Sequence, residues 1–206
     1  MTFPDQGFEN IVAFSRAYFD QMGRAAESVE GAKLHDAAEM LGDAYDRRAT
    51  VYVCGNGGSA SISNHLVCDH LKGVQTDTET RPRVVSLSAN IETITAIAND
   101  ISYDDVFVYQ LRTLAEPGDV LVTISSSGNS ENIVRAGQWA RDNNCKVIAL
   151  TGFDGGRSAE LADVNVHVAG DNYGVVEDLH QSVMHILAQY LRLKRMDADL
   201  IGERKF

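Results

Sequence analysis

Two loops of unusual composition carry the most evident chemistry in this sequence. Residues 55–59 read Gly-Asn-Gly-Gly-Ser, and residues 125–130 read Ser-Ser-Ser-Gly-Asn-Ser. Glycines let the backbone approach a ligand closely, and serine hydroxyls together with the free amides of a helix start supply neutral donors for an anion. Each loop alone also fits a tight turn or a helix cap. Because both follow predicted strands, their recurrence favours a site for a small phosphate.

Nucleotide binding is a weaker explanation of the first loop. Gly55, Gly57 and Ala60 match the spacing of a loose dinucleotide fingerprint. That motif expects an acidic residue at the end of the second strand, where this chain reads Ser-Leu-Ser-Ala-Asn at 86–90. The loop is not followed by Gly-Lys-Ser/Thr either, so it is not a Walker A motif. The sequence therefore argues against a nucleotide cofactor.

A second group of residues could bind a metal ion or move protons. His65 and Asp69 are four apart on one predicted helix, and Glu177 and His185 are eight apart on the last one, so each pair shares a side of its helix. Imidazoles and carboxylates suit a divalent metal such as zinc, and they serve equally as acid and base. A surface His–Asp pair beside a polar terminal helix explains the same spacing. Spacing alone does not choose between His180 and His185.

The elements that must position these residues alternate along the chain. Mostly apolar runs predict strands at 50–54, 83–88, 120–124, 146–150 and 164–168, and helical patterns lie at about 59–72, 92–115, 130–144, 157–162 and 174–195. This alternation predicts a three-layer α/β sandwich with a central parallel sheet, which binds ligands beyond the carboxyl ends of its strands. Two pieces within about 8–48 predict an N-terminal helical hairpin, in which Ser28 could cap the second helix. We expect one domain over 1–206, with its α/β core at about 50–195.

Composition and charge exclude several classes of function. The chain has 206 residues and a net charge of −11, which disfavours direct contact with nucleic acid or with an anionic membrane surface. No apolar run approaches the roughly 18 residues of a membrane span, and residues 1–6 lack a secretory-signal pattern. The three widely spaced cysteines predict no disulfide framework, so we expect a cytoplasmic protein. Structural roles are expected for His35, Cys68, His70 and His167.

Together, these motifs resemble the sugar isomerase (SIS) domain family. Besides both loops and His65 with an acid at 69, the resemblance rests on motifs at 95–100 (Thr-Ala-Ile-Ala-Asn-Asp), 103–107 (Tyr-Asp-Asp-Val-Phe), 150–156 (Leu-Thr-Gly-Phe-Asp-Gly-Gly), and 177–180 (Glu-Asp-Leu-His) with His185. Over nearly the full chain the sequence is similar to the phosphoheptose isomerase branch, the sedoheptulose 7-phosphate isomerases. The resemblance implies the SIS, flavodoxin-like sheet and a homotetramer in which the helical hairpin packs against neighbouring subunits.

The resemblance also implies roles for individual residues. It implies one zinc ion per subunit, with Asp69 as general base and His185 as its acid partner. The zinc ligands it implies are His65, Asp69, Glu177 and His185. The residues it implies for the substrate and its phosphate are Asn56, Gly57, Ser59, Asn90, Ser125, Ser126, Ser127, Ser130 and Glu177.

This chain departs from the family's usual pattern near the expected site. The family usually has Glu at 69, Gln at 177, Asp at 90 and Arg-Ile at 175–176, where this chain has Asp69, Glu177, Asn90 and Val-Val. Positions 69 and 177 still carry carboxylates and both histidines are present. We therefore expect a catalytic site.

The expected function is an aldose–ketose isomerase that converts sedoheptulose 7-phosphate to D-glycero-D-manno-heptose 7-phosphate through an enediol. Asp69 would remove the proton beside the carbonyl and His185 would move protons on the oxygens or the neighbouring carbon, while zinc would polarise the carbonyl. The departures leave two alternatives open. One is a non-catalytic SIS protein that binds a partner protein or senses a phosphosugar, and the other is an isomerase of a different phosphosugar.

Overall fold

The computed structural model describes residues 2–206 and contains a five-stranded parallel sheet. Its strands are β1 (Thr50–Gly55), β2 (Arg83–Ser86), β3 (Val120–Ser125), β4 (Lys146–Thr151) and β5 (Val164–His167). Their order across the sheet is β2-β1-β3-β4-β5, and every neighbouring pair is parallel. The predicted α/β class with a central parallel sheet is therefore confirmed.

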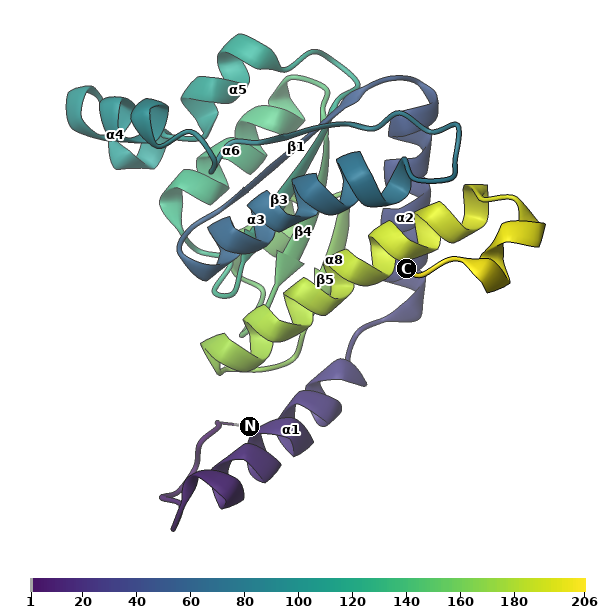
Figure 1. The fold of residues 1–206 in the computed structure, drawn as a ribbon. Coiled ribbons are helices and arrows are strands. Elements are labelled where there is room, and N and C mark those ends of the chain that lie inside the picture. Colours follow the sequence, from purple (N-terminus) through teal and green to yellow (C-terminus); the bar gives the residue numbers. More distant parts are fainter. Residues whose placement is uncertain (1) are drawn as a thin grey trace.

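Helices cover both faces of this sheet (Figure 1). They are α1 (Ile11–Ala26), α2 (Gly31–Asp46), α3 (Gly58–Cys68), α4 (Ile91–Asp100), α5 (Val108–Leu114), α6 (Glu131–Asp142), α7 (Gly156–Leu161) and α8 (Tyr173–Arg195). α2, α3 and α8 pack on one face, and α4, α5 and α6 pack on the other. None of the helices within residues 2–206 combines the length and the apolar character that crossing a membrane requires.

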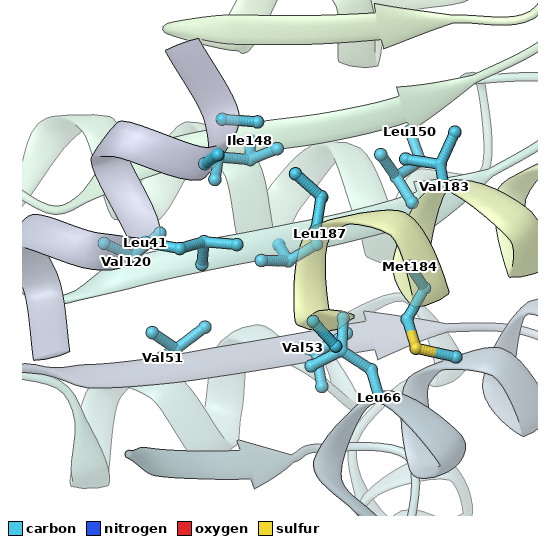
Figure 2. Close-up of a cluster of buried hydrophobic side chains, with 14 of the residues drawn as sticks. Leu41, Val51, Val53, Leu66, Val120, Ile148, Leu150, Val183, Met184 and Leu187 are labelled. Atoms are coloured by element: carbon cyan, nitrogen blue, oxygen red, sulfur yellow. The ribbon is translucent and has the colours of Figure 1, made fainter. Parts of the chain in front are cut away.

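Alternating strand residues build a separate core on each face of the sheet. Along β1, Val51 and Val53 belong to the core beneath α2, α3 and α8, whereas Tyr52 and Cys54 belong to the core beneath α4, α5 and α6. Figure 2 shows the first of these cores, where Leu187 of α8 points toward the strands. Each aliphatic side chain buried in this way contributes about 1.5–3 kcal/mol. The packing fixes the position of α8, which carries Glu177 and His185, two of the four predicted zinc ligands.

The two N-terminal helices form as predicted, but they do not pack against each other. Figure 1 shows α1 lying beyond the end of α2 rather than alongside it. The aromatic side of α1 packs against the first turns of α8, where the Tyr18 hydroxyl donates to the Asp178 carboxylate at 2.6 Å. Ser28 does not cap α2, because its hydroxyl donates to the Ala25 carbonyl and Glu30 occupies the cap position. The expected hairpin is thus two helices in succession, since α1 finds its packing partner in α8.

Two predicted helices are interrupted close to the expected site. The pattern at 92–115 is divided into α4 and α5 by a short 3-10 turn, Tyr103–Asp105. The pattern at 59–72 continues past α3 as a π-helical turn, Asp69–Val74. This turn begins at Asp69, and π-helical turns inside helices are frequent at functional sites.

Candidate active site

The strand order places the glycine-rich and serine-rich loops beside one another. The chain leaves β1 to form β2 on one side and then returns to form β3 on the other side of β1. In open parallel sheets such a change of direction opens a crevice at the carboxyl ends of the strands concerned. Gly55 at the end of β1 pairs in register with Ile124 near the end of β3. The two loops predicted to bind phosphate therefore meet at the same end of the sheet.

Hydroxyl and amide groups of these loops line a small cavity. This serine cavity has a volume of about 120 Å³ and is lined by Asn56, Ser59, Ile124, Ser125, Ser126, Ser127, Ser130, Tyr173 and Glu177. Asn56 is held by reciprocal amide hydrogen bonds with Asn132, both 2.9 Å long, and it also accepts from the Tyr103 hydroxyl at 2.9 Å. Most of the residues predicted to bind the substrate thus lie around one space, supplied by both loops and by α8.

The backbone of the second loop adopts a shape that requires glycine. Gly128 has a φ of +65°, and a Cβ at this position would lie 1.9 Å from the Gly155 carbonyl oxygen. The Gly128 carbonyl accepts hydrogen bonds from the Ser158 amide and the Ser158 hydroxyl, each at 2.9 Å. The segment after β4 therefore packs directly against the serine loop and holds its conformation.

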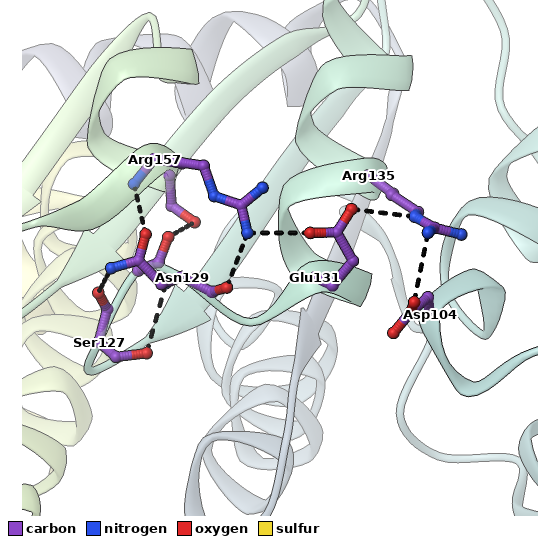
Figure 3. A network of polar contacts seen from close by, with 8 residues as sticks. Asp104, Ser127, Asn129, Glu131, Arg135 and Arg157 are labelled. Atoms are coloured by element: carbon purple, nitrogen blue, oxygen red, sulfur yellow. Dashed lines mark hydrogen bonds and ion pairs between the residues drawn. The ribbon is translucent and has the colours of Figure 1, made fainter.

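Carboxylates already engage the arginines near the serine loop. Arg157 lies 2.9 Å from Glu131, and its backbone amide donates to the Asn129 side chain at 3.1 Å. Figure 3 shows both contacts. Arg135 lies 3.1 Å from the same glutamate and 3.2 Å from Asp104. Of the described residues that line the serine cavity, none is a lysine or an arginine. An anion bound there would be held by hydroxyls, backbone amides and helix N-termini rather than by an ion pair.

Ser126 offers a direct test of this cavity. Its hydroxyl is buried and has no hydrogen-bond partner among residues 2–206. Ser126→Ala is expected to leave the free energy of unfolding within about 0.5 kcal/mol of the parent value, because no bond is lost. It should weaken binding of inorganic phosphate by about 10-fold or more, the effect of losing a hydrogen bond to a charged group. Calorimetric titration and urea denaturation measure the two quantities.

Ser158→Ala is the matched control for this experiment. It removes the hydroxyl that donates to the Gly128 carbonyl, so it should lower stability by about 1 kcal/mol. Equal phosphate affinity in Ser126→Ala and the parent protein would show that the hydroxyl does not face the anion.

A second group of residues, from α3, the π-helical turn and α8, joins two imidazoles to a carboxylate. Asp69 Oδ1 lies 3.3 Å from His65 Nε2, and Asp69 Oδ2 lies 3.5 Å from His185 Nε2. One ligand atom from each of the three residues lies within 4.8 Å of the others. All three side chains are partly exposed, so a ligand can reach them. We call these residues the His–Asp group; the fold brings its members together from distant parts of the sequence.

The structure also distinguishes the two candidate histidines of α8. His180 is fully buried, and burial lowers its pKa to about 4, so it is a neutral residue of the core. His185 lies five residues further on, which turns it to the side of α8 that faces Asp69. His70, predicted to be structural, is likewise buried, and its ring is hydrogen-bonded to the Tyr45 hydroxyl.

Sequence reasoning missed one member of this constellation, Gln181. Its Nε2 lies 3.2 Å from His65 Nδ1 and 3.1 Å from His185 Nε2. The amide therefore stands between the two imidazoles. The spacing of Gln181 in the sequence could have predicted this contact, since a residue four positions before His185 shares the same side of α8.

Glu177, predicted to be both a metal ligand and a substrate ligand, lies in the serine cavity. Its carboxylate packs over Gly58 at the start of α3, where an added Cβ would lie 2.3 Å from a carboxylate oxygen. Burial there, together with the neighbouring Asp178, raises the pKa of Glu177. The His–Asp group as found does not include it.

Other predicted positions have evident backbone or packing roles. Asn90 caps α4 by accepting from the Thr93 amide at 2.8 Å, and it does not line the serine cavity. Gly57 has a φ of +54° at the cap position of α3. Val175 and Val176, where the resemblance expects Arg-Ile, are fully buried in the apolar cluster between α1 and α8. The apolar pair at 175–176 is therefore explained by its packing.

A larger cavity of about 410 Å³ adjoins the His–Asp group. Asp69 and His185 form part of its lining, and Lys72, Arg192 and Phe206 form another part. Arg192 donates to the Lys205 carbonyl at 3.0 Å and lies 4.7 Å from the centre of the Phe206 ring. The C-terminal residues thus make one wall of the cavity beside the His–Asp group.

Comparisons with known proteins agree with this fold. Residues 17–152 match the family model of the SIS domain. The chain is 36% identical over 178 residues to the phosphoheptose isomerase of Alteromonas mediterranea, an alignment that covers 85% of this chain and 89% of that protein. It is 38% identical over 170 residues to the phosphoheptose isomerase of Colwellia psychrerythraea, with 81% and 86% covered. The solved structure of the phosphoheptose isomerase GmhA from Neisseria gonorrhoeae matches with a TM-score of 0.81 at 31% identity, covering 88% of this chain and 98% of that one.

The chain therefore belongs to the SIS-domain family. The three similar proteins named above are phosphoheptose isomerases, which is the branch that the sequence motifs resemble.

Proposed function

We propose that this protein is a phosphosugar isomerase that converts sedoheptulose 7-phosphate to D-glycero-D-manno-heptose 7-phosphate. Two different sites lie along α8, and their spacing supports this function. Glu177 lines the serine cavity, and His185 belongs to the His–Asp group. At 1.5 Å of rise per residue, these two positions are about 12 Å apart. An extended seven-carbon sugar phosphate has a comparable length, so its phosphate can occupy the serine cavity while its first two carbons reach the His–Asp group.

Asp69 and His185 supply the base and the acid that this isomerisation needs. Starting from the ketose, Asp69 takes a proton from C1 and an enediol forms between C1 and C2. His185 gives a proton to the C2 oxygen and accepts one from the C1 oxygen. Return of a proton to C2 then leaves the carbonyl at C1. The reaction gains and loses no atoms or electrons overall, so no redox cofactor is consumed.

The His–Asp group also fits a divalent metal ion by its donors. Two imidazole nitrogens and a carboxylate within 4.8 Å of one another are a donor set typical of catalytic zinc sites. We propose zinc, held by His65, Asp69 and His185, which would polarise the sugar carbonyl when bound. The resemblance to the family implies Glu177 as a further zinc ligand. In this structure the Glu177 carboxylate lies over Gly58, outside the His–Asp group.

We further propose a cytoplasmic homotetramer, as the resemblance implies. Several large apolar side chains are exposed on α1 and α8, namely Ile11, Phe19, Ile186, Tyr190 and Leu193. Exposed apolar surface of this kind is suited to burial against other subunits. The three cysteines are all free, as is usual in a reducing compartment.

Purified, zinc-loaded protein is expected to convert sedoheptulose 7-phosphate to the aldose, with solvent deuterium entering at C2 when the reaction runs in D₂O. NMR spectroscopy follows both the product and the deuterium. Zinc chelation and His185→Ala should each abolish the conversion. Binding of the phosphosugar without any product would instead identify a sensor of phosphosugars. Faster turnover of another member of a phosphosugar panel would identify a different substrate.

A further inference from the structure

Asn56 lines the serine cavity, and its side chain is held from two directions. Its Nδ2 donates to Asn132 Oδ1 and its Oδ1 accepts from Asn132 Nδ2, each at 2.9 Å. The same Oδ1 accepts from the Tyr103 hydroxyl at 2.9 Å. A side-chain amide carries two N–H hydrogens, so these bonds leave one of them for a ligand. The two partners therefore set the direction in which Asn56 presents its remaining donor.

These two partners belong to different segments of the chain. Asn132 lies in the first turn of α6, directly after the serine loop, and is buried. Tyr103 begins the 3-10 turn between α4 and α5, and its side chain is half exposed. Neither residue lines the serine cavity itself. Both can therefore act on an anion in the cavity through Asn56, without contacting that anion.

An ionic network holds the 3-10 turn that carries Tyr103. Figure 3 shows Arg135 of α6 between Asp104, which belongs to this turn, and Glu131. The guanidinium lies 3.2 Å from Asp104 and 3.1 Å from Glu131. A single exposed ion pair contributes little to stability, but one guanidinium that bridges two carboxylates constrains their relative positions. The Tyr103 hydroxyl is thus kept beside Asn56 although its ring is half exposed.

We propose that Asn132 and Tyr103 are positioning residues for the phosphate group of the substrate, because together they orient the Asn56 amide at the serine cavity. This role rests on the proposed function in taking the serine cavity to hold the phosphate. The hydrogen bonds set the direction of the amide before the phosphate arrives, so binding does not have to order that side chain. Three segments that are distant in sequence thereby act on one donor.

Titration of the full-length protein with inorganic phosphate tests this role without measuring turnover. Asn132→Ala is expected to raise the phosphate dissociation constant by about 10-fold, and Tyr103→Phe, which removes only a hydroxyl, by about 3-fold. Tyr109 on α5 is also about half exposed, and Tyr109→Phe should leave the constant unchanged. Asn143→Ala is the control for Asn132, because it removes a side-chain hydrogen bond to the Trp139 carbonyl at the other end of α6. It should also leave phosphate binding unchanged.

A second measurement separates positioning from a general disturbance of the fold. In a protein that already carries Asn56→Ala, the substitutions at 103 and 132 should have no further effect on phosphate affinity, since the amide that they orient is gone. Urea denaturation reports whether each variant is folded. Tyr103→Phe changes a half-exposed side chain and is expected to fold normally, so it tests the role even if Asn132→Ala does not fold.

Several results would overturn this assignment. An unchanged phosphate affinity in Tyr103→Phe or in Asn132→Ala would remove that residue from the positioning role. Effects that remain as large in the Asn56→Ala background would show that they do not act through Asn56. A parent protein that binds no phosphate would remove the serine cavity as the anion site and this role with it. Failure of the proposed function looks different, because phosphate binding would still depend on both residues while sedoheptulose 7-phosphate stayed unconverted.

Discussion

Asp69→Asn is expected to lower kcat/KM for sedoheptulose 7-phosphate by about 1,000-fold or more. The proposed base must accept a proton from carbon, and a carboxamide does not do so; general-base catalysis of this kind contributes about 10²–10⁴-fold. The variant is also expected to bind the metal ion less well, because the Asp69 oxygens lie 3.3 Å and 3.5 Å from the two imidazoles of the proposed metal site. Replacing the carboxylate therefore removes both the base and a charged metal ligand.

Kinetics and metal analysis of the same preparations separate these two losses. If the Asp69→Asn protein still binds zinc but no longer turns over substrate, the loss is that of the base. Asp69→Glu moves the carboxylate by one methylene and is expected to retain more activity than the asparagine variant. Asp36→Asn, on the exposed side of α2, is the matched control and should leave kcat/KM unchanged. Turnover by Asp69→Asn within about ten-fold of the parent value would remove Asp69 from the role of base.

Gly128→Ala is expected to damage both stability and substrate binding. The residue has a φ of +65°, and the new Cβ would meet the Gly155 carbonyl oxygen at 1.9 Å, so the serine loop or the segment behind it must move. The strained backbone and the displaced contact together should lower the free energy of unfolding by about 2–4 kcal/mol. A displacement of the phosphate by about 1 Å should lower kcat/KM by about 100-fold. Urea denaturation and steady-state kinetics measure the two effects.

Gly23→Ala is the matched control for the serine-loop variant. Gly23 lies within α1, and a Cβ there would meet no heavy atom within 4 Å. Alanine at this position should be neutral or stabilise the protein by up to about 1 kcal/mol, because it favours the helix. A Gly128→Ala variant with parental stability and parental KM would mean that the serine loop tolerates a different shape.

Much of the sheet and both loops could be predicted from local sequence. The run 120–124 is apolar at every position except Thr123, which is typical of strands buried on both faces, and β3 is indeed buried throughout. The glycines and serines after β1 and β3 predicted a ligand site between the two loops, because backbone freedom and hydroxyl groups are local properties of the sequence. The serine cavity found between them is consistent with that reading.

Contacts between helices were harder to predict. Helical periodicity shows which residues share a side of one helix, but it does not show which neighbour that side meets. For this reason α1 was expected to pack on α2 and instead packs on α8. For the same reason spacing left His180 and His185 equivalent, although one is buried in the core and the other contacts Asp69.

By itself, the sequence of this protein determined the alternation of strands and helices, the two loops rich in glycine and serine, and the residue types able to move a proton. Only the tertiary structure decided that Gln181 stands between the imidazoles and that Glu177 lies in the serine cavity. The physical reason is that backbone propensities and apolar periods act over a few residues. The distances among α3, the π-helical turn and α8 are instead set by how their side chains pack together on the sheet.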